Sequence, residues 1–489
     1  MEEKKTQYLT TSEHDLQIAA ELLRQGGTVI FPTETVYGLG ANALDARAAE
    51  KIFAAKGRPA DNPLIVHIAE RSALEGLAAS VPDRAMRLMD TFWPGPLTLI
   101  LPRAEQVPKT VTGGLDTVAV RMPSQPVARR LLALAGVPVA APSANLSGKP
   151  SPTSFRHVRE DMDGRVDAVI DGGDCAVGVE STVLDLTGER PVLFRPGGVT
   201  LEQIEAVTGP VDVVTKAANG EAPRSPGLKY KHYAPNAEVR ILHGSVEQVR
   251  DYAKEQCAKG RTGMLVFDEL PDLGGALVTR SLGSRTRPEE AAHRLFTALR
   301  ELDAAGVSVI LAPEIPESGV WRAVRNRLYR AGGERVVDLT QKREREILAV
   351  CTGNTCRSPM AEGILRELAR QTEREIRVSS AGLCADGAPV SAHAAAALAE
   401  KGIDISGHRA RQLTPDMVRS ADLILTMTGA HRQMLAAALP DAAEKVFTLA
   451  QWAGEEGDVL DPFGGSLEQY RACRDQIWEL LRKGWERSL

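Results

Sequence analysis

Short apolar runs alternate with amphipathic helical patterns along almost the whole chain of 489 residues. One such run, 28–31, follows a glycine pair, and comparable runs occupy 97–101, 118–121, 137–140 and 181–184. A run of four or five mainly β-branched and aliphatic residues predicts a buried strand, and helices between such strands cover the faces of a sheet. The alternation therefore predicts an α/β fold, and the chain is long enough for about three domains.

Composition excludes several classes of protein. Hydrophobic residues make up 43% of the chain and charged residues 25%, which is typical of a folded globular protein and excludes a mainly disordered one. The net charge of -5 argues against general polyanion binding, so a nucleic-acid contact would need a local basic patch. No apolar run approaches the roughly 18 residues of a membrane span, and the first 15 residues lack a signal-peptide core. Six scattered cysteines make neither a disulfide framework nor a zinc site, so we expect a cytoplasmic protein.

Changes in the pattern predict separate segments. Residues 1–211 mix short strands with helices and are expected to form a first α/β domain. Residues 212–236 lose periodicity and contain the sequence EAPRSPGLKYKHYAP, whose prolines exclude a regular helix. Unlike a Gly/Ser-rich linker, this stretch carries Tyr-Lys-His-Tyr at 230–233. We therefore expect it to lie against another part of the protein.

The rest of the chain predicts two further domains. Residues 237–335 repeat strand and helix three times, which predicts a small Rossmann-like domain with a parallel sheet. This segment holds no catalytic constellation, so a docking or positioning role is expected for it. A charged stretch, 332–346, marks the last boundary. Residues 346–489 predict a second complete α/β domain, with a strand at 347–350 and a helix that opens at Pro359.

The sequence Cys351-Thr-Gly-Asn-Thr-Cys-Arg357-Ser358-Pro359 lies between that strand and that helix. A loop that runs into a helix N-terminus points backbone N–H groups at one spot and binds an oxyanion. The same field stabilises a thiolate, so we expect Cys351 to be a nucleophile. Arg357 can hold two phosphate oxygens bidentately. Ser358 could donate to the thiolate and Asn354 could brace the loop, and the remaining phosphate-loop residues are Thr352, Gly353, Thr355 and Cys356.

A leaving group also needs a proton, and Asp461 is the candidate donor. It stands in Asp461-Pro462-Phe463, just before the last predicted helix. A carboxyl group there could act as general acid and then as the base that activates water. The alternative is an ordinary Asp-Pro turn.

Residues 346–489 resemble the low-molecular-weight protein tyrosine phosphatase family. The resemblance rests on CTGNTCRSPMAE, on SSAG at 379–382, on ADLILTMT and on DPFGGS. It implies phosphorylated proteins as substrates, a phosphocysteine intermediate and no cofactor. Thr355 stands where tyrosine-specific members carry a larger apolar residue, and Phe463-Gly464-Gly465 stands where they carry aromatics, which favours the bacterial protein-arginine phosphatases. Phospho-tyrosine specificity is the alternative, and Cys356 either packs in the loop or forms a reversible disulfide with Cys351.

Dense polar motifs fill the first part of the chain. They are PTETVYGLG (32–40), KGRPADNPLIVH (56–67), WPGPLT (93–98), APSANLSGKPSPT (141–153), GVESTVLD (178–185) and RPGG (195–198). Singly, each motif has an ordinary interpretation as a turn or a helix cap. Together they supply cations and hydroxyls for phosphate groups, and His67 and Arg121 for a small carboxylate. Without a Walker loop or a Ser-His-Asp triad, they predict nucleotide activation by positioning and charge neutralisation, with a metal carried by the nucleotide.

These motifs closely resemble the YrdC/YwlC family of threonylcarbamoyl-AMP synthases over residues 8–235, and the segment that follows matches the long form of that family. The resemblance implies a twisted α/β sheet with a positively charged cavity. It implies that L-threonine, bicarbonate and ATP with Mg²⁺ are condensed into threonylcarbamoyl-adenylate and pyrophosphate. The product feeds tRNA modification, so downstream tRNA-modification proteins are expected partners. The residues implied for ATP are Lys56, Arg58, Asn62, Thr117, Ser143, Asn145, Ser151, Arg195 and Tyr233. The residues implied for threonine are Thr35, His67, Arg121, Ala141 and Ser181.

The sequence therefore predicts a bifunctional enzyme, a synthase joined to a phosphatase. One alternative keeps both folds but changes the substrates, so that the first part adenylates another carbamate and the second cleaves phosphotyrosine. In another, the first part binds RNA without synthase activity. Pyrophosphate release that depends on threonine separates these interpretations.

Overall fold

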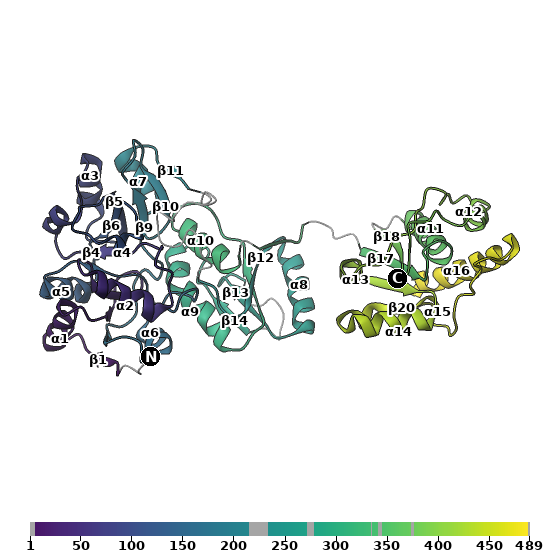
Figure 1. Cartoon of the computed structure of the whole chain (residues 1–489), viewed down its shortest axis with the longest axis horizontal. Coiled ribbons are helices and arrows are strands. Elements are labelled where there is room, and N and C mark those ends of the chain that lie inside the picture. The colour runs from purple at the N-terminus through teal and green to yellow at the C-terminus, as the bar shows by residue number, and fades with distance from the viewer. Residues whose placement is uncertain are drawn as a thin grey trace. The chain divides into compact units, whose positions relative to one another are not determined.

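The computed structural model describes residues 5–214, 233–270, 278–333, 335–340, 345–372 and 376–487. The chain separates into two compact units, Met1–Gln341 and Lys342–Leu489 (Figure 1). Each unit combines sheets with helices, which confirms the predicted α/β class. Within the described ranges, no helix is long and apolar enough to cross a membrane. Residues 230–232 of the Tyr-Lys-His-Tyr stretch lie outside the described residues, and the boundaries at 211 and 236 stay predictions.

The first unit begins with an 11-stranded mixed sheet. The pairs β1/β8, β8/β2, β4/β6, β5/β9 and β10/β11 are parallel, and the other neighbours are antiparallel. In spatial order the strands are β1 (Gln7–Leu9), β8 (Ala168–Ile170), β2 (Val29–Phe31), β3 (Gly38–Asn42), β7 (Val139–Ala140), β4 (Ile65–His67), β6 (Thr117–Arg121), β5 (Leu97–Pro102), β9 (Thr182–Asp185), β10 (Val192–Arg195) and β11 (Asp212–Val213). The helices are α1 (Glu13–Arg24), α2 (Ala46–Lys56), α3 (Asp83–Phe92), α4 (Lys109–Thr112), α5 (Pro126–Ala135), α6 (Phe155–Met162) and α7 (Leu201–Thr208), with a 3-10 turn at Arg71–Gly76.

The strand predicted at 137–140 is shorter than expected, because β7 contains only Val139 and Ala140. Pro138 has no N–H to give to a ladder, and proline is found at strand starts and edges for that reason. The remaining four strands predicted in this part of the chain differ from the observed ones by one residue at most at either end.

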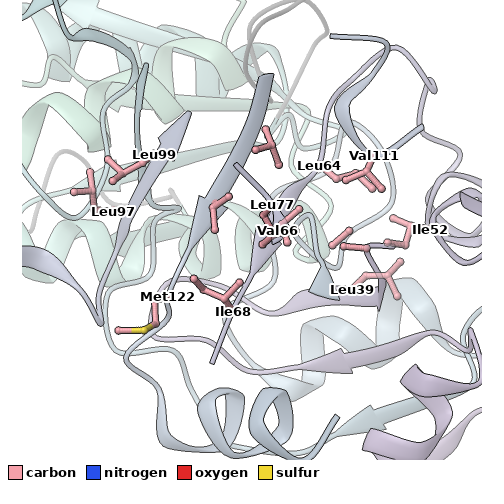
Figure 2. Packing of buried hydrophobic residues seen from close by; sticks show 14 of the residues in the cluster. Leu39, Ile52, Leu64, Val66, Ile68, Leu77, Leu97, Leu99, Val111 and Met122 are labelled. Carbon is pink, nitrogen blue, oxygen red and sulfur yellow. The ribbon is translucent and has the colours of Figure 1, made fainter. Parts of the chain in front are cut away.

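The central strands of this sheet are buried on both faces. Leu97, Leu99 and Val120 point into a large apolar cluster on one face (Figure 2). Ile100 and Ala119, their neighbours in sequence, belong to a separate small cluster on the other face. Successive side chains of a strand point to opposite faces, so the middle of each of these strands is apolar on both sides. The polar site residues therefore come from strand ends and loops.

A five-stranded sheet completes the first unit, in the order β14-β13-β15-β12-β16, and all of its described pairs are parallel. Its strands are β12 (Glu238–His243), β13 (Thr262–Val266), β14 (Val278–Ser281), β15 (Val309–Pro313) and β16 (Val336–Asp338). Its helices are α8 (Val246–Lys259), α9 (Pro288–Ala304) and α10 (Trp321–Ala331).

The two sheets of the first unit share one core. Val36 and Val179 from the large-sheet part cluster with Phe296 of α9 and Leu328 of α10. A Cβ at Gly178 would lie 2.4 Å from the Cα of His293, so the two parts are in backbone contact there. The parallel-sheet part is thus packed tightly against the large-sheet part.

The second unit contains a four-stranded parallel sheet in the order β18-β17-β19-β20. Its strands are β17 (Arg345–Cys351), β18 (Ile376–Gly382), β19 (Leu423–Thr426) and β20 (Val446–Thr448). Its helices are α11 (Arg357–Gln371), α12 (Ala392–Ala399), α13 (Pro415–Ser420), α14 (Gly429–Ala438), α15 (Leu449–Ala453) and α16 (Leu467–Arg487), with a 3-10 turn at Pro440–Lys445. The helix predicted to open at Pro359 begins two residues earlier, at Arg357. The loop between β17 and α11 therefore lies at the carboxyl edge of the sheet, where open α/β sheets bind ligands.

Candidate functional sites

One cavity of the first unit collects side chains from most of the polar motifs. The predicted site residues that line it are Thr35, Lys56, Arg58, His67, Arg121, Ala141, Ser143, Asn145, Ser181, Arg195 and Tyr233. Asn62, Thr117 and Ser151 are not among its lining residues. Ser151 contacts a lining residue instead, because its hydroxyl donates to the carboxylate of Glu180, which lines the cavity.

At one end of the cavity a buried ion pair fixes Arg121. Its Nη2 lies 2.6 Å from Oε1 of Glu34, and the two side chains are 4% and 8% exposed. Arg121 also donates to the hydroxyl of Thr35 at 2.9 Å. Burial opposes ionisation of Glu34, but the guanidinium of Arg121 outweighs it and holds the pKa of that carboxyl below its usual range. Arg121 is therefore a charged group held in one orientation, which suits recognition of a carboxylate.

His67 is the neutral polar group beside Arg121. Burial, with the positive charge of Arg121, lowers the pKa of His67 to about 3. Its ring lies edge-on to Phe31, and Nδ1 is 3.1 Å from the carbonyl oxygen of Ile65. The imidazole is uncharged at neutral pH, so it adds hydrogen bonding without adding charge.

Lys56 joins the end of α2 to the hydroxyl-rich loop. Its ammonium donates to the carbonyl oxygens of Ser143 and Asn145, both at 2.5 Å. Within the loop, the Ser143 hydroxyl donates to the Asn145 side chain at 2.6 Å. Burial, and then the charge of Arg58, lower the pKa of Lys56. These contacts hold the loop against α2, where its hydroxyls face the cavity.

Arg195 and Ser181 form another part of the cavity wall. The guanidinium of Arg195 donates to the carbonyl and the hydroxyl oxygens of Ser181, at 3.0 and 3.1 Å. The turn after Arg195 packs directly on this backbone: a Cβ at Gly197 would lie 2.3 Å from the amide nitrogen of Thr182. Only glycine leaves room for that approach.

Sequence reasoning missed three charged residues of this region. Glu34 and Glu180 lie inside two of the polar motifs, but a glutamate in a polar motif is usually solvent-exposed, so neither was singled out. The third is Arg327 of α10, in the segment without a catalytic constellation. No local sequence signal marks it, because it lies in an ordinary amphipathic pattern.

The loop after β17 brings together the side chains of the second site. Sγ of Cys351 accepts the N–H of Asn354 at 3.2 Å and lies 3.0 Å from the Ser358 hydroxyl. Arg357 donates from Nη2 to Oδ2 of Asp461 at 2.6 Å. The loop thus holds the residues predicted as nucleophile and phosphate-binding cation, and Arg357 contacts the predicted proton donor, as in-line displacement at phosphorus would require.

Asn354 is the brace of this loop. It has a φ of 57°, a conformation that most side chains avoid. Its amide donates to the hydroxyls of Ser358 and Ser380 at 2.9 and 2.8 Å, and its Oδ1 accepts the N–H of Arg411 at 2.8 Å. Ser380 in turn donates to the buried carboxylate of Glu362 at 2.6 Å. The network extends from the loop into the core of the second unit.

The other loop residues have separate contacts. Thr352 Oγ1 lies 2.9 Å from Nε2 of His431, whose pKa is lowered by burial and by the charge of Arg357. Sγ of Cys356 lies 3.2 Å from the Tyr470 hydroxyl, and burial, with Cys356 next, raises the pKa of Tyr470 to about 12. Cys351 and Cys356 are both free thiols in this structure.

Three known protein families match successive parts of the chain. A family described as "Telomere recombination" (Sua5, YciO and YrdC) matches residues 21–197. "Threonylcarbamoyl-AMP synthase, C-terminal domain" matches residues 199–333. "Low molecular weight phosphotyrosine protein phosphatase" matches residues 346–488.

Individual relatives match each part over most of their own length. A threonylcarbamoyl-AMP synthase of Pyrococcus abyssi is 50% identical over 337 residues, which are 66% of this chain and 96% of that protein. A protein-arginine-phosphatase of Bacillus subtilis is 45% identical over 140 residues, 28% of this chain and 93% of the relative. The crystal structure of P. abyssi Sua5 complexed with L-threonine is 48% identical, covers 68% of this chain and 99% of that one, and has a TM-score of 0.64.

The role of Asn354 in holding the loop between β17 and α11 can be tested with two substitutions. Glycine adopts a positive φ without strain but lacks the amide, whereas alanine lacks the amide and is also strained at a positive φ. Alanine should therefore lower the free energy of unfolding of the second unit by about 1 kcal/mol more than glycine does. Both should slow hydrolysis of an aryl phosphate by at least about tenfold, because the loop is no longer held in place. Denaturant unfolding and initial rates measure the two effects. Full activity in Asn354→Gly would show that the amide contacts are dispensable.

Proposed function

This chain belongs to the threonylcarbamoyl-AMP synthase family through residues 21–333 and to the low-molecular-weight phosphatase family through residues 346–488, and from this premise we propose that it is a bifunctional enzyme. The first activity forms L-threonylcarbamoyladenylate and pyrophosphate from L-threonine, bicarbonate and ATP, for tRNA modification. The second removes phosphate from protein phospho-arginine through a phosphocysteine intermediate. Downstream tRNA-modification proteins and phosphorylated proteins are the proposed partners, and a cytoplasmic location stays a prediction.

The observation that carries the synthase proposal is the fixed Arg121 in a cavity that Lys56, Arg58 and Arg195 also line. Arg121 would pair with the threonine carboxylate, beside Thr35 and neutral His67. The neutral threonine amine then attacks the carbon of bicarbonate and water leaves (with carbon dioxide, a proton leaves instead), and the resulting carbamate oxygen attacks the α-phosphorus of ATP as pyrophosphate leaves. Lys56, Arg58 and Arg195 would neutralise the phosphates, with Mg²⁺ carried by ATP.

The remaining assignments differ in support. Ser143, Asn145, Ala141, Ser181 and Tyr233 line the cavity and are proposed to contact substrates there, whereas Ser151 acts through Glu180. The proposal that Asn62 and Thr117 contact ATP rests on the family resemblance alone.

Threonine-dependent pyrophosphate release tests the synthase activity. With ATP, Mg²⁺ and bicarbonate, release should require threonine. Arg121→Lys should raise the KM for threonine about tenfold, because lysine cannot form the fork that binds Glu34 and a carboxylate together. The control is Arg129→Ala, an exposed position on α5, which should leave the KM unchanged. Absence of threonine-dependent release would favour the RNA-binding alternative.

In the phosphatase half, the Cys351 thiolate is proposed to attack phosphorus while Arg357 holds the non-bridging oxygens. The S–P bond forms as the P–N bond breaks, and Asp461 gives its proton to the leaving nitrogen. Asp461 then takes a proton from water, which attacks the phosphocysteine and releases phosphate. The contact of Asp461 with Arg357 supports these roles because it places the acid beside the phosphate-binding group.

Two features support phospho-arginine as the substrate. Thr355 adds a hydroxyl to the loop, and Phe463 is 78% exposed next to two glycines, so the rim near Asp461 is open. The similarity to the B. subtilis protein-arginine-phosphatase also favours it, whereas the description of the matching family favours phospho-tyrosine.

Turnover of matched phospho-arginine and phospho-tyrosine peptides decides between the two. The intact protein should prefer phospho-arginine, with Cys351→Ser as the blank. Thr355→Val keeps the side-chain shape but removes the hydroxyl, and it should reduce that preference about tenfold if the hydroxyl contacts the guanidinium. A wild-type preference for phospho-tyrosine would contradict the arginine assignment and leave the roles of Cys351, Arg357 and Asp461 standing.

A further inference from the structure

Arg327 of α10 extends from the parallel-sheet part of the first unit to the wall of the synthase cavity. Its side chain is completely buried, and its Nε donates to Oε2 of Glu180 at 2.8 Å. Its Nη1 donates to the carbonyl of Pro196 at 2.5 Å, and its Nη2 donates to the carbonyl of Glu180 at 3.3 Å. Apart from the adjacent Asn326, these hydrogen-bond partners all belong to the large-sheet part, at the two motifs that form the wall.

Glu180 places a negative charge in that wall. Its carboxylate is 7% exposed, lines the cavity and accepts the Ser151 hydroxyl at 2.5 Å. Burial opposes its ionisation, but Arg327, followed by Arg195, outweighs burial and lowers the pKa of Glu180. Tyr233 and Lys56 also face it. At neutral pH the wall therefore contains an ionised carboxylate.

An ionised carboxylate repels the negatively charged triphosphate of ATP. In a partly dehydrated cavity, like charges repel much more strongly than they do in water. The cations on the other walls attract the nucleotide, but an uncompensated Glu180 would work against them. The ion pair with Arg327 supplies the missing positive charge from outside the cavity.

Arg327 also lies near Tyr233, which covers part of the cavity. The guanidinium carbon is 5.8 Å from the centre of the Tyr233 ring, and that ring lies 5.3 Å from Phe296 of α9. The backbone after Tyr233 is tied to the hydroxyl-rich loop, since the N–H of Ala234 donates to the carbonyl of Gly148 at 2.8 Å. The parallel-sheet part thus supports a residue of the site as well as its charge balance.

We propose that Arg327 is a positioning residue of the synthase site, which neutralises Glu180 so that the cavity accepts the phosphates of ATP. This inference rests on the proposed synthase activity. It gives the parallel-sheet part a specific chemical role, because that part supplies the ion-pair partner of Glu180 and adds its charge to that of Arg195 at this wall. Arg327 contacts no reacting atom, so its loss should act on ATP binding and not on the chemical step.

The test measures the KM for ATP in threonine-dependent pyrophosphate release by the full chain. Arg327→Met should raise this KM at least about tenfold, because removing one partner leaves a buried charge unpaired. The kcat should stay within about threefold of wild type, because no group that touches the reacting atoms has changed.

A charge effect also predicts a pH dependence that a packing defect does not. Arg327 is the largest of the influences that lower the pKa of Glu180, so without it that pKa should rise and the repulsion should weaken as the pH is lowered. The variant-to-wild-type ratio of KM should therefore fall as the pH is lowered. The ratio is the readout because Lys56 and ATP titrate in both proteins.

The decisive arm is the double variant Arg327→Met/Glu180→Gln. Removing the carboxylate charge should return the KM to within about threefold of the Glu180→Gln single variant. No charge stays unpaired in the double variant, so it carries the test even if Arg327→Met fails to fold. An unchanged KM in Arg327→Met, or a raised KM that Glu180→Gln does not rescue, overturns the proposal.

Arg325→Met is the matched control. Arg325 lies on α10, is 23% exposed and pairs with Glu317 at 2.9 Å, but it is not part of the cavity lining. It should lower the unfolding temperature and leave the KM for ATP unchanged. If wild type releases no pyrophosphate with threonine, the proposed function fails. Equilibrium dialysis of ATP against the same variants then decides on Arg327 separately.

Discussion

The ion pair between Glu34 and Arg121 is the interaction on which the cavity of the first unit depends. A cavity that binds a carboxylate and a triphosphate needs buried cations, and a buried cation without a partner costs about 3–5 kcal/mol. The carboxylate of Glu34 meets this requirement at 2.6 Å, and Arg121 then orients Thr35 and keeps His67 neutral. Glu180 with Arg327 repeats the arrangement at the other wall. Glu34 and Glu180 are thus buried because each one compensates a buried arginine of the proposed site.

The second unit concentrates positive potential in a different way. The backbone N–H of Asn354 donates to Sγ of Cys351 in the short loop that leads into α11, and a network of neutral hydrogen bonds through the Asn354 side chain holds that loop. The ion pair at its reacting centre joins Arg357 to Asp461, and the Asp461 side chain is 53% exposed, against 8% for Glu34. The carboxylate of this pair is half exposed although Arg357 is buried, so water can replace the guanidinium as its partner. That suits the proposed role of Asp461, which is to exchange a proton with each substrate.

Sequence reasoning located the elements and most of the cavity lining, because strands, turns and cationic motifs leave local signals. It missed what depends on partners far apart in the chain. Arg327 and Glu180 are 147 residues apart, and nothing near either residue indicates that they pair. The roles of Asn62 and Thr117 at the nucleotide were implied by the family resemblance, and these two residues are not among the lining residues. The sequence predicts that α11 begins at Pro359, because proline favours the first turn of a helix. In the structure the loop ends two residues earlier, and α11 begins at Arg357.

If one chain carries two independent active sites, each can be removed without loss of the other. The direct measurement is to assay pyrophosphate release and phosphate hydrolysis side by side for wild type, Arg58→Ala and Cys351→Ser. Arg58→Ala should lose the first activity and keep the second within about twofold, and Cys351→Ser should do the reverse, because the two residues belong to separate compact units. A single substitution that abolishes both activities would contradict the account.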